Sequence, residues 1–310
     1  MNTKNIAIGA DVGGSHITCT AVDLISGQLL SATETRTAIA HEEPAEVLFQ
    51  AWADALNTCY SHIDPRHFAG WGFAIPGPFD YKMGISHMQH KFRAIYGMHI
   101  PTHLKPLLQP AEDLPIRFLN DASAFAVGEA WVGEGRGMHR VIVITLGTGF
   151  GAAYVENGIP IVERQDVAPE GCFWHLPYKE GIADEYFSTG WFTRNYELKT
   201  GSTLDNVKNL VDDPQKKAIA DSLFREFAHN LAEFLTPWLR LFPADMLVIG
   251  GNISKALPRF QSELVQNLHE AGIRLRIAPS RLMETSATLG SARLLDEPFW
   301  EQVSQHLPNI

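Results

Sequence analysis

The hydrophobic and polar positions near the N-terminus alternate as they do in a β-hairpin. This alternation predicts strands over residues 6–10 and 17–23, and the turn between them, residues 11–15, reads Asp-Val-Gly-Gly-Ser. Two glycines beside a hydroxyl can turn backbone N–H groups toward an anion, and Asp11 is placed to hold a cation near that anion. The hairpin therefore indicates a phosphate and its magnesium. An ordinary hairpin that uses glycines for geometry is the alternative.

The same pattern returns later in the chain. Residues 141–161 again read as strand, glycine-and-hydroxyl turn, strand, turn and strand, with Gly147, Thr148 and Gly149 in the first turn. A separation of about 130 residues is too long for a solenoid repeat and favours two related halves, each with a phosphate-binding hairpin. Two such loops facing each other across a cleft would clamp a triphosphate. The doubling is a stronger indication than either loop alone.

Helices and strands alternate along the rest of the chain, and strands that alternate with helices and end in glycine turns predict an α/β fold in two lobes. We place the boundary near Leu119, with an N-terminal lobe over 1–119 and a C-terminal lobe over 120–287. The last helix, within 288–310, is free to pack back on the first lobe. Further helices are expected over 43–60, 122–132, 214–241 and 260–271, and strands over 70–75, 116–119, 244–249 and 273–278.

Composition and charge narrow the class of protein. Hydrophobic residues make up 45% and charged residues 19% of the 310 residues, which is typical of a soluble globular protein with room for two cores. A net charge of −10 argues against nucleic acid as a partner, because the phosphate backbone attracts positive charge. We find no apolar run of membrane-spanning length and no secretory segment before the first strand. Three widely separated cysteines suit the reduced cytoplasm.

The pair Asn120-Asp121 follows a short apolar strand and precedes a helix. An aspartate at this point serves well as a helix N-cap, and on local sequence alone capping is the simpler interpretation. The functional hypothesis is that Asp121 accepts the proton of a substrate hydroxyl as that hydroxyl attacks a γ-phosphorus. Phosphoryl transfer asks a protein mainly for positioning, charge neutralisation and one well-placed carboxylate.

The chain resembles the ROK family of sugar kinases and related repressors in five segments that occur in the family's order and spacing. These segments are DVGGSHITCTAVD, GFAIPGPFD, LNDASAFAVGE, ITLGTGFGAA and DMLVIGGNIS. The resemblance covers nearly the whole chain. It implies the two-lobed actin-like ATPase fold (ribonuclease H-like, also found in hexokinase and Hsp70), with duplicated βββαβαβα lobes and an interlobe cleft. It also implies ATP and Mg²⁺ as cofactors, and a homodimer.

The resemblance also implies roles for individual residues. On the nucleotide side it implies a first phosphate loop, formed by Asp11, Gly13, Gly14 and Ser15. It implies a second phosphate loop formed by Thr148 and Gly149. It also implies an adenosine contact formed by Gly250 and Gly251. Asp11 would hold Mg²⁺ through phosphate or water. On the sugar side it implies Asp121 as the catalytic base, with Gly77 and Asn120 as substrate contacts. Lys91 lies in a loop that departs from the family, and we interpret it as a substrate-loop donor or simply an exposed side chain.

The sugar-binding segment departs from the family pattern. The family carries GE[IL]GH after the second hairpin, and an ungapped count aligns it with residues 169–173, where Glu170 is kept and Phe173 replaces the histidine. Zinc-containing relatives use that histidine and a following CxCGxxGC as ligands. Cys172 and His175 supply two ligands, fewer than the four of a structural zinc site, so we expect no structural zinc. His175 has two interpretations: a sugar donor in place of the missing histidine, or a packed loop residue.

Residues 184–190 resemble the family's LExxxSG, which makes Glu185 a second sugar carboxylate beside Glu170. A solvated loop glutamate is the alternative for each. These features together predict an ATP-dependent kinase that phosphorylates a sugar hydroxyl, the 6-hydroxyl of a hexose or amino-hexose, with no nucleic-acid or membrane partner.

Three alternatives stay open. The first is a sugar-responsive regulator, which the acidic charge and the early first strand at Ile6 disfavour, because such repressors carry a helix-turn-helix before it. The second is a sugar-binding or chaperone-like protein without transferase activity, because this fold hosts several functions. The third is a kinase that uses polyphosphate or another phosphoryl donor.

Overall fold

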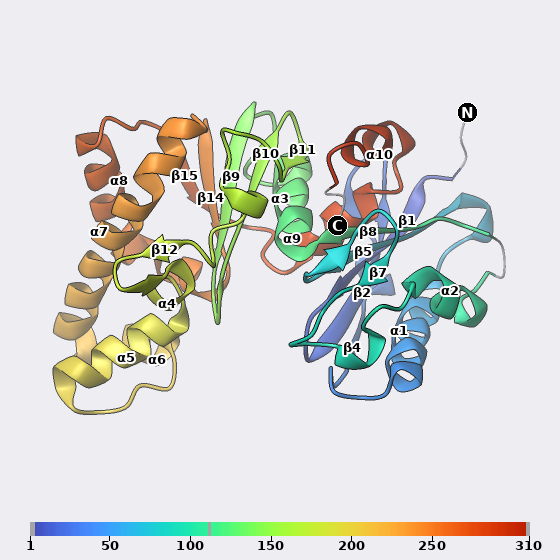
Figure 1. Ribbon diagram of the computed structural model, residues 1–310, viewed down its shortest axis with the longest axis horizontal. Helices are drawn as coiled ribbons and strands as arrows, with labels where there is room; N and C mark the ends of the chain where they lie inside the picture. Colours follow the sequence, from blue (N-terminus) through green and yellow to red (C-terminus); the bar gives the residue numbers. More distant parts are fainter. Residues whose placement is uncertain (1–3, 111–112, 308–310) are drawn as a thin grey trace. The chain divides into compact units, whose positions relative to one another are not determined.

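The protein is represented by a computed structural model that describes residues 4–110 and 113–307. These residues form two compact units, whose helices and strands are labelled in Figure 1. Unit 1 comprises Met1–Arg136, Gly158–Pro160 and Glu284–Ile310, and unit 2 comprises Gly137–Asn157 and Ile161–Met283. Every helix in the described part of the chain is too short or too polar to traverse a lipid bilayer.

The elements of unit 1 surround one mixed sheet. Its strands are β1 (Ile6–Val12), β2 (His16–Asp23), β3 (Gln28–Leu29), β4 (Thr35–Ala38), β5 (Phe68–Ile75) and β8 (Ile116–Asn120), and a separate small ribbon pairs β6 (Phe79–Asp80) with β7 (Ile85–Ser86). Its helices are α1 (Ala45–Tyr60), α2 (Ile100–Leu104), α3 (Asp121–Val132), α9 (Thr285–Arg293) and α10 (Glu297–Val303).

Strand order in this sheet determines where the loops of unit 1 gather. The order is β3-β2-β1-β5-β8, with β4 paired to β2. Strands β1 and β2 form an antiparallel hairpin, whereas β1, β5 and β8 run parallel. The carboxyl ends of β1, β5 and β8 therefore meet at one edge of the sheet, which is where parallel α/β sheets usually bind ligands.

Helices cover both faces of the unit 1 sheet. Successive strand residues point to opposite faces, so glycines on one face alternate with large side chains on the other. On one face, a side chain at Gly72 would collide with the Ser291 backbone of α9, so glycine permits close helix–strand packing. On the other face, the ring of Phe73 lies 6.4 Å from that of Trp52 in α1. Both aromatic side chains are buried.

Helix α3 packs against α9, and this contact changes the expected domain boundary. A side chain at Gly128 would collide with Ser286, and one at Gly290 with the Ala124 backbone, so these two helices approach closely through glycine. Because α9 and α3 belong to one packed layer, unit 1 extends to Arg136 rather than ending near Leu119. The described part of the final segment, residues 284–307, is assigned to unit 1, and residues 308–310 lie outside the described residues.

The sheet of unit 2 repeats the arrangement of the first. Its strands are β9 (Arg140–Leu146), β10 (Phe150–Glu156), β14 (Met246–Gly250) and β15 (Arg276–Pro279), with β11 (Ile159–Ile161), of which only Ile161 is assigned to unit 2, at the edge, in the order β11-β10-β9-β14-β15. Again an antiparallel hairpin, β9 with β10, is followed by parallel partners. The duplication that the two hairpins predicted is therefore confirmed in the topology of both sheets.

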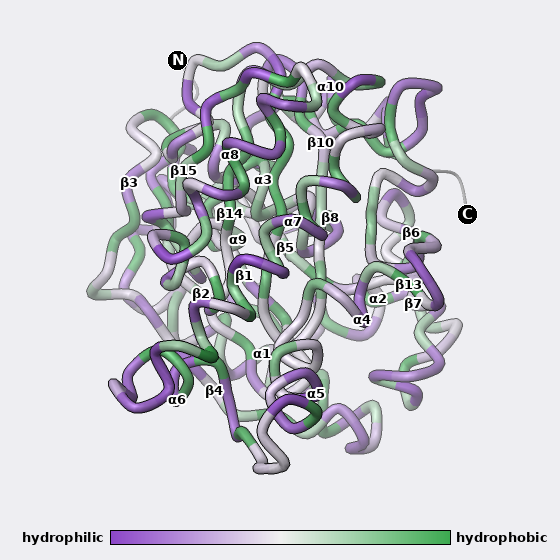
Figure 2. Tube along the Cα trace, turned by 90° about the vertical axis from the view of Figure 1, so that its left-hand side faces the viewer, coloured by the Kyte–Doolittle hydropathy of each residue, from purple (hydrophilic) through white to green (hydrophobic). Residues whose placement is uncertain are grey.

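Long amphipathic and aromatic segments form the core of unit 2. Helix α7 (Lys217–Leu241) buries the aromatic side chains Phe224, Phe227 and Phe234 on one side. The remaining elements are α4 (Ala183–Tyr186), α5 (Thr189–Thr200), α6 (Val207–Asp212), α8 (Gln261–Glu270), and the paired short strands β12 (Pro177–Tyr178) and β13 (Gly181–Ile182). In Figure 2 the hydrophilic stretches recur in outer turns, which agrees with strands that are buried along most of their length.

Candidate active site

The first predicted phosphate loop joins β1 to β2 in unit 1. The backbone N–H of Gly13 donates to the His16 carbonyl at 3.0 Å, which closes the turn. A side chain at Gly14 would lie 3.4 Å from Cδ2 of His41 and 3.9 Å from Cδ of Lys91, so these two residues flank the loop. Ser15 is exposed. An open glycine turn beside a lysine has the features of an anion site.

The Asn120-Asp121 pair shows which residue caps α3. Asn120 is the N-cap, because its Oδ1 accepts from the backbone N–H groups of Ala122 and Ser123 at 3.0 and 3.2 Å. Asp121 occupies the first helical position, and its Oδ1 accepts from the Ala122 N–H at 2.8 Å. Capping is thus the task of Asn120, which removes the simplest structural explanation for an aspartate at position 121.

Asn120 is connected to the predicted Gly77 contact through a tyrosine. Its Nδ2 donates to Oη of Tyr81 at 3.2 Å, and that hydroxyl donates to the Ile75 carbonyl at 3.3 Å. A side chain at Gly77 would lie 3.1 Å from the same Tyr81 hydroxyl. Gly77 and Asn120 therefore lie together at the edge where β5 and β8 end. Tyr81 carried no sequence motif and was missed.

Lys91 is positioned by the residue that follows it. Phe92 adopts a left-handed backbone conformation with φ of 50°, which is uncommon for a non-glycine residue, and its buried ring lies 5.7 Å from that of Trp52. This packing holds Lys91 beside Gly14. The charge of Lys91 also reaches Asp121 and lowers the pKa of its carboxyl. The loop lysine therefore faces both the first phosphate loop and the predicted base.

Two carboxyl groups in unit 1 have raised pKa values. Burial raises the pKa of Asp121, and the Ala122 N–H and the charge of Lys91 partly offset that effect. The pKa of Asp11 rises to about 7, first because of burial and then because of the negative charges of Asp121 and Glu284. The charge of Arg36 acts in the opposite direction. The predicted base and the predicted cation ligand are thus electrostatically coupled.

Arg36 and Glu284 were not recognised from the sequence. Strand β4 sets Arg36 opposite Thr18, and Thr18 lies opposite Asp11, so the three residues form one row across the sheet. Arg36 Nη1 also lies 3.1 Å from Oε2 of Glu284, which precedes α9. Neither residue belongs to a glycine motif, and only the β2–β4 pairing and the return of α9 bring them near Asp11.

The second predicted phosphate loop joins β9 to β10 in unit 2. The Gly147 N–H donates to the Gly149 carbonyl at 3.0 Å, and Thr148 and Gly149 are exposed. Two outside residues fix this loop. Thr189, at the start of α5, donates to the Gly147 carbonyl through its N–H at 2.7 Å and its Oγ1 at 2.9 Å. The Phe150 N–H donates to Oδ1 of Asp184 at 2.7 Å.

Gly250 and Gly251 lie at the same sheet edge as this second loop. Strand β14 runs parallel to β9, with Gly250 opposite Thr145. Gly251 has φ of 78°, and a side chain there would collide with the Leu146 carbonyl, so only glycine fits without strain. Ser254 Oγ donates to the Gly251 carbonyl at 2.7 Å. The two predicted nucleotide segments of unit 2 are therefore neighbours.

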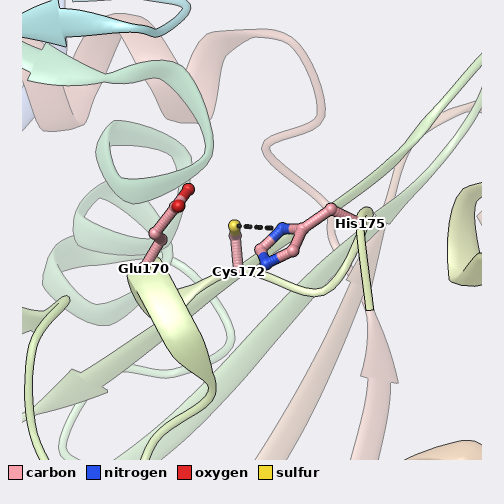
Figure 3. Close-up of side chains that lie close together, drawn as sticks. All are labelled: Glu170, Cys172 and His175. Carbon is pink, nitrogen blue, oxygen red and sulfur yellow. Dashed lines mark hydrogen bonds between the residues drawn. The ribbon is translucent and has the colours of Figure 1, made fainter. Parts of the chain in front are cut away.

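Phe173, which replaces the family histidine, is a core residue. It is fully buried, and its ring lies 5.5 Å from Tyr154 and 5.4 Å from Phe234. Glu170 is exposed and has a left-handed backbone with φ of 58°. His175 instead lies next to Cys172, with Nδ1 3.5 Å from Sγ, and Figure 3 shows both near Glu170. The polar side chains of Glu170, Cys172 and His175 therefore lie together, apart from the buried ring of Phe173.

Glu185 has a local structural partner. Its Oε2 accepts from the Ile182 N–H at 3.1 Å, at the beginning of α4, and its side chain is exposed. Its neighbour Asp184, which the sequence did not single out, holds the second loop through the Phe150 N–H. A sugar-binding role for Glu185 stays a prediction, and the geometry gives this carboxylate a capping function.

Comparisons with known proteins agree with these motifs. A glucokinase of Thermotoga maritima is 23% identical over 94% of this chain and 97% of its own length. An N-acetyl-D-glucosamine kinase of Escherichia coli O127:H6 is 25% identical over 84% of this chain and 88% of its own length.

A solved ROK glucokinase from Streptomyces griseus, in complex with glucose and AMPPNP, has the same fold, which confirms the predicted two-lobed actin-like ATPase class. Its TM-score is 0.74 and its identity 22%, over 94% of this chain and 99% of that one. The ROK family profile itself matches residues 7–297. The chain therefore belongs to the ROK family.

Proposed function

We propose that this protein, a sugar kinase of the ROK family, transfers the γ-phosphoryl group of ATP to the 6-hydroxyl of a hexose or amino-hexose, with Asp121 as the general base. The observation that carries the proposal is that two consecutive residues at the start of α3 have different roles. Asn120 caps the helix, which leaves Asp121 as a half-buried carboxylate that the charge of Lys91 reaches and whose pKa is raised by desolvation. A base whose pKa lies closer to neutrality is a better proton acceptor for an alcohol.

The phosphate donors in this proposal are backbone amides and one cation. The turns at Gly13-Gly14 and Thr148-Gly149 supply N–H groups for the phosphates, with Lys91 beside the first turn. Preorganised donors of this kind stabilise the charge that develops in phosphoryl transfer. Gly250 and Gly251 are the proposed adenosine contacts.

The residues around Asp11 fit a magnesium ion. Besides burial, which is the largest cause, the negative charges of Asp121 and Glu284 raise the pKa of Asp11, and a divalent cation would offset that negative charge. Mg²⁺ prefers oxygen ligands and binds through one or two carboxylates and substrate phosphates. Asp11 would hold it, and the bound ion would neutralise phosphate charge. Asp121 would remain the residue that takes the proton.

The proposed sugar contacts in unit 1 are Gly77, Lys91 and Asn120. Glu170 of unit 2 is proposed as a further contact on its own chemistry, because carboxylates and amides suit adjacent sugar hydroxyls. The relatives named glucokinase and N-acetyl-D-glucosamine kinase support a hexose or amino-hexose as the substrate class. A cytoplasmic homodimer without nucleic-acid or membrane partners completes the proposal.

A coupled ADP-release assay tests this function. The purified protein, with ATP and Mg²⁺, is incubated with glucose, mannose, N-acetylglucosamine, N-acetylmannosamine and fructose. We expect sugar-dependent ADP release with at least one aldohexose or amino-hexose, and a product that carries phosphate on O6 by phosphorus NMR. Sugar phosphate that forms with polyphosphate but not with ATP, detected by phosphorus NMR because that transfer releases no ADP, would overturn the proposed donor. Saturable sugar binding without any transfer would favour the non-catalytic or regulatory alternative.

A further inference from the structure

Three side chains of unit 2 converge on one point in a manner that the kinase reaction does not require. The ligand atoms of Glu170, Cys172 and His175 all lie within 4.8 Å of one another. Figure 3 shows the Cys172 thiol between the Glu170 carboxylate and the His175 imidazole. Among residues 4–110 and 113–307, this is the group of histidine, cysteine and acidic residues that comes close enough to share one metal ion.

The spacing between the sulfur and the nitrogen matches a tetrahedral metal centre. Sγ of Cys172 lies 3.5 Å from Nδ1 of His175. In a tetrahedral zinc site, bonds of about 2.3 Å to sulfur and about 2.0 Å to nitrogen place these two atoms about 3.5 Å apart. The thiol and imidazole therefore need little movement to share one ion. The exposed Glu170 side chain can supply the third ligand by rotation about its own bonds.

The backbone that carries these ligands is fixed by its surroundings. Phe173, between Cys172 and His175, is fully buried in the aromatic core. The Leu176 N–H donates to the Phe173 carbonyl at 3.0 Å, and the Asp184 N–H donates to the Trp174 carbonyl at 3.0 Å. The backbone that carries Cys172 and His175 therefore does not have to be ordered when the metal binds, and only the Glu170 side chain has to rotate.

The chemistry of the three ligands selects the ion. A thiolate and an imidazole suit zinc, whereas Mg²⁺ and Ca²⁺ take oxygen ligands almost exclusively. We propose that Glu170, Cys172 and His175 bind a zinc ion, with the fourth position open to water. Such a three-ligand centre differs from the four-ligand structural zinc site whose absence the sequence predicts, because Glu170 adds a ligand that cysteine and histidine counting does not include.

Zinc at this point would regulate the kinase. This consequence rests on the proposed function, in which the Glu170 carboxylate binds a sugar hydroxyl. A carboxylate that ligates zinc cannot accept the same hydrogen bonds from the sugar, so zinc and sugar exclude each other. A zinc concentration ten times its dissociation constant would then raise the KM for sugar by about tenfold without changing kcat.

Cobalt(II) tests the site independently of any enzymatic activity. The full-length protein is stripped of metal with a chelator and titrated with cobalt. We expect one equivalent to bind and to produce a thiolate-to-cobalt charge-transfer absorption, which zinc then abolishes by displacement. Cys172→Ser should remove the absorption, and His175→Gln should weaken cobalt binding at least tenfold. Cys59→Ala is the matched control, because it removes a buried thiol of unit 1 and should leave the absorption intact.

Two results overturn the proposal: cobalt binding without a thiolate absorption, or an absorption that survives Cys172→Ser in a variant with wild-type circular dichroism. Kinase assays then test the regulatory step, with wild-type protein and Cys172→Ser compared at equal zinc. Equal inhibition of both would overturn competition at this site. A protein that gives the cobalt absorption but phosphorylates no sugar would contradict the proposed function and leave the metal site standing.

Discussion

The two glycine hairpins share a strand arrangement but differ in what surrounds them. In unit 1 the loop after β1 is flanked by charged side chains, with Lys91 beside Gly14 and the acidic Asp11 on the strand itself. In unit 2 the loop after β9 is fixed by neutral donors from Thr189 and by Asp184, which accepts a backbone N–H. Duplication has thus kept the backbone turn while the chemistry diverged. We infer that the unit 1 loop lies beside the proposed general base and magnesium ligand, whereas the unit 2 loop contributes neutral donors.

The largest expected effect comes from a substitution that removes the carboxylate charge of Asp121 in unit 1. Asp121→Asn preserves the shape of the side chain and the bond from the Ala122 N–H but cannot accept the hydroxyl proton. We expect kcat to fall by about 10²–10⁴-fold, the usual contribution of a general base, with sugar binding by calorimetry changed little. Asp64→Asn, an exposed aspartate of the same unit, is the matched control and should retain full turnover. Normal kcat in Asp121→Asn would exclude it as the base.

Thr148→Ala makes the corresponding change in unit 2. It deletes the hydroxyl of the second loop and leaves the amides, so we expect a smaller loss in kcat/KM, about 10–100-fold, typical of one hydrogen bond to a charged group. A loss as large as that of Asp121→Asn would contradict the division of chemistry between the units.

The glycine turn after β14 in unit 2 and the loop after β1 in unit 1 also differ in how much backbone freedom they need. Gly251→Ala puts a side chain against the Leu146 carbonyl at a backbone φ of 78°, so we expect a loss of about 2–4 kcal/mol in the free energy of unfolding. Gly14→Ala meets its nearest neighbour at 3.4 Å, so its stability should change by less than about 0.5 kcal/mol while the KM for ATP rises. Urea denaturation and steady-state kinetics of both variants measure this contrast, and a stable Gly251→Ala protein would refute it.

The sequence was sufficient for features that depend on local pattern. Both hairpins, their glycine turns and the repeated strand order follow from alternation and glycine spacing, and the structure has them. The Asn120 cap is also visible in retrospect, since asparagine before a helix is a favoured N-cap. The sequence predicts a domain boundary near Leu119, because the signals there are local. Its position after Arg136 depends on glycine contacts between α3 and α9, which no local pattern reports.

The rest of the site could not be predicted because it depends on tertiary contacts. Glu284 affects Asp11 only because α9 returns to the first sheet, and Asp184 reaches the Phe150 N–H across 34 residues of sequence. The ungapped count aligns the family histidine with Phe173, which is a buried core residue. Buried aromatic and polar side chains alternate in that segment, so counting positions does not identify the polar one. Spacing alone does not distinguish inward from outward positions in an irregular loop.

The dependence of the free energy of unfolding on pH tests this contrast next, because unit 1 contains a carboxyl group whose pKa is raised in the folded protein. The pKa of Asp11 is about 7 in the folded protein and about 3.9 in an unfolded chain, so the folded state binds the proton more tightly. The free energy of unfolding that this residue contributes is therefore complete below about pH 4 and is lost as the pH rises through about 7. Asp11→Asn should flatten that slope and stabilise the protein at pH 8 by about 1–2 kcal/mol.

Asp64 is a control for this measurement, because its pKa is shifted in the opposite direction. Its hydrogen bonds with Arg66 lower its pKa to about 2, so its contribution is present above the unfolded pKa and is lost as the pH falls. Asp64→Asn should therefore reduce stability near neutral pH, in contrast to Asp11→Asn. Parallel pH profiles for wild type and Asp11→Asn would show that the pKa of Asp11 is not raised in the folded protein.

The smallest expected effect concerns Glu185 of unit 2, compared with the nearby Glu180. Glu185 caps α4 through the Ile182 N–H, so Glu185→Ala should cost about 1 kcal/mol in the free energy of unfolding, the usual value of a lost cap. If capping is its whole role, the KM for sugar should change by less than twofold. Glu180→Ala, an exposed residue just before α4, controls for lost surface charge and should leave both quantities unchanged. A tenfold rise in the KM for sugar in Glu185→Ala, at unchanged kcat, would instead make Glu185 the second sugar carboxylate and would give unit 2 a larger share of substrate recognition than its loop chemistry indicates.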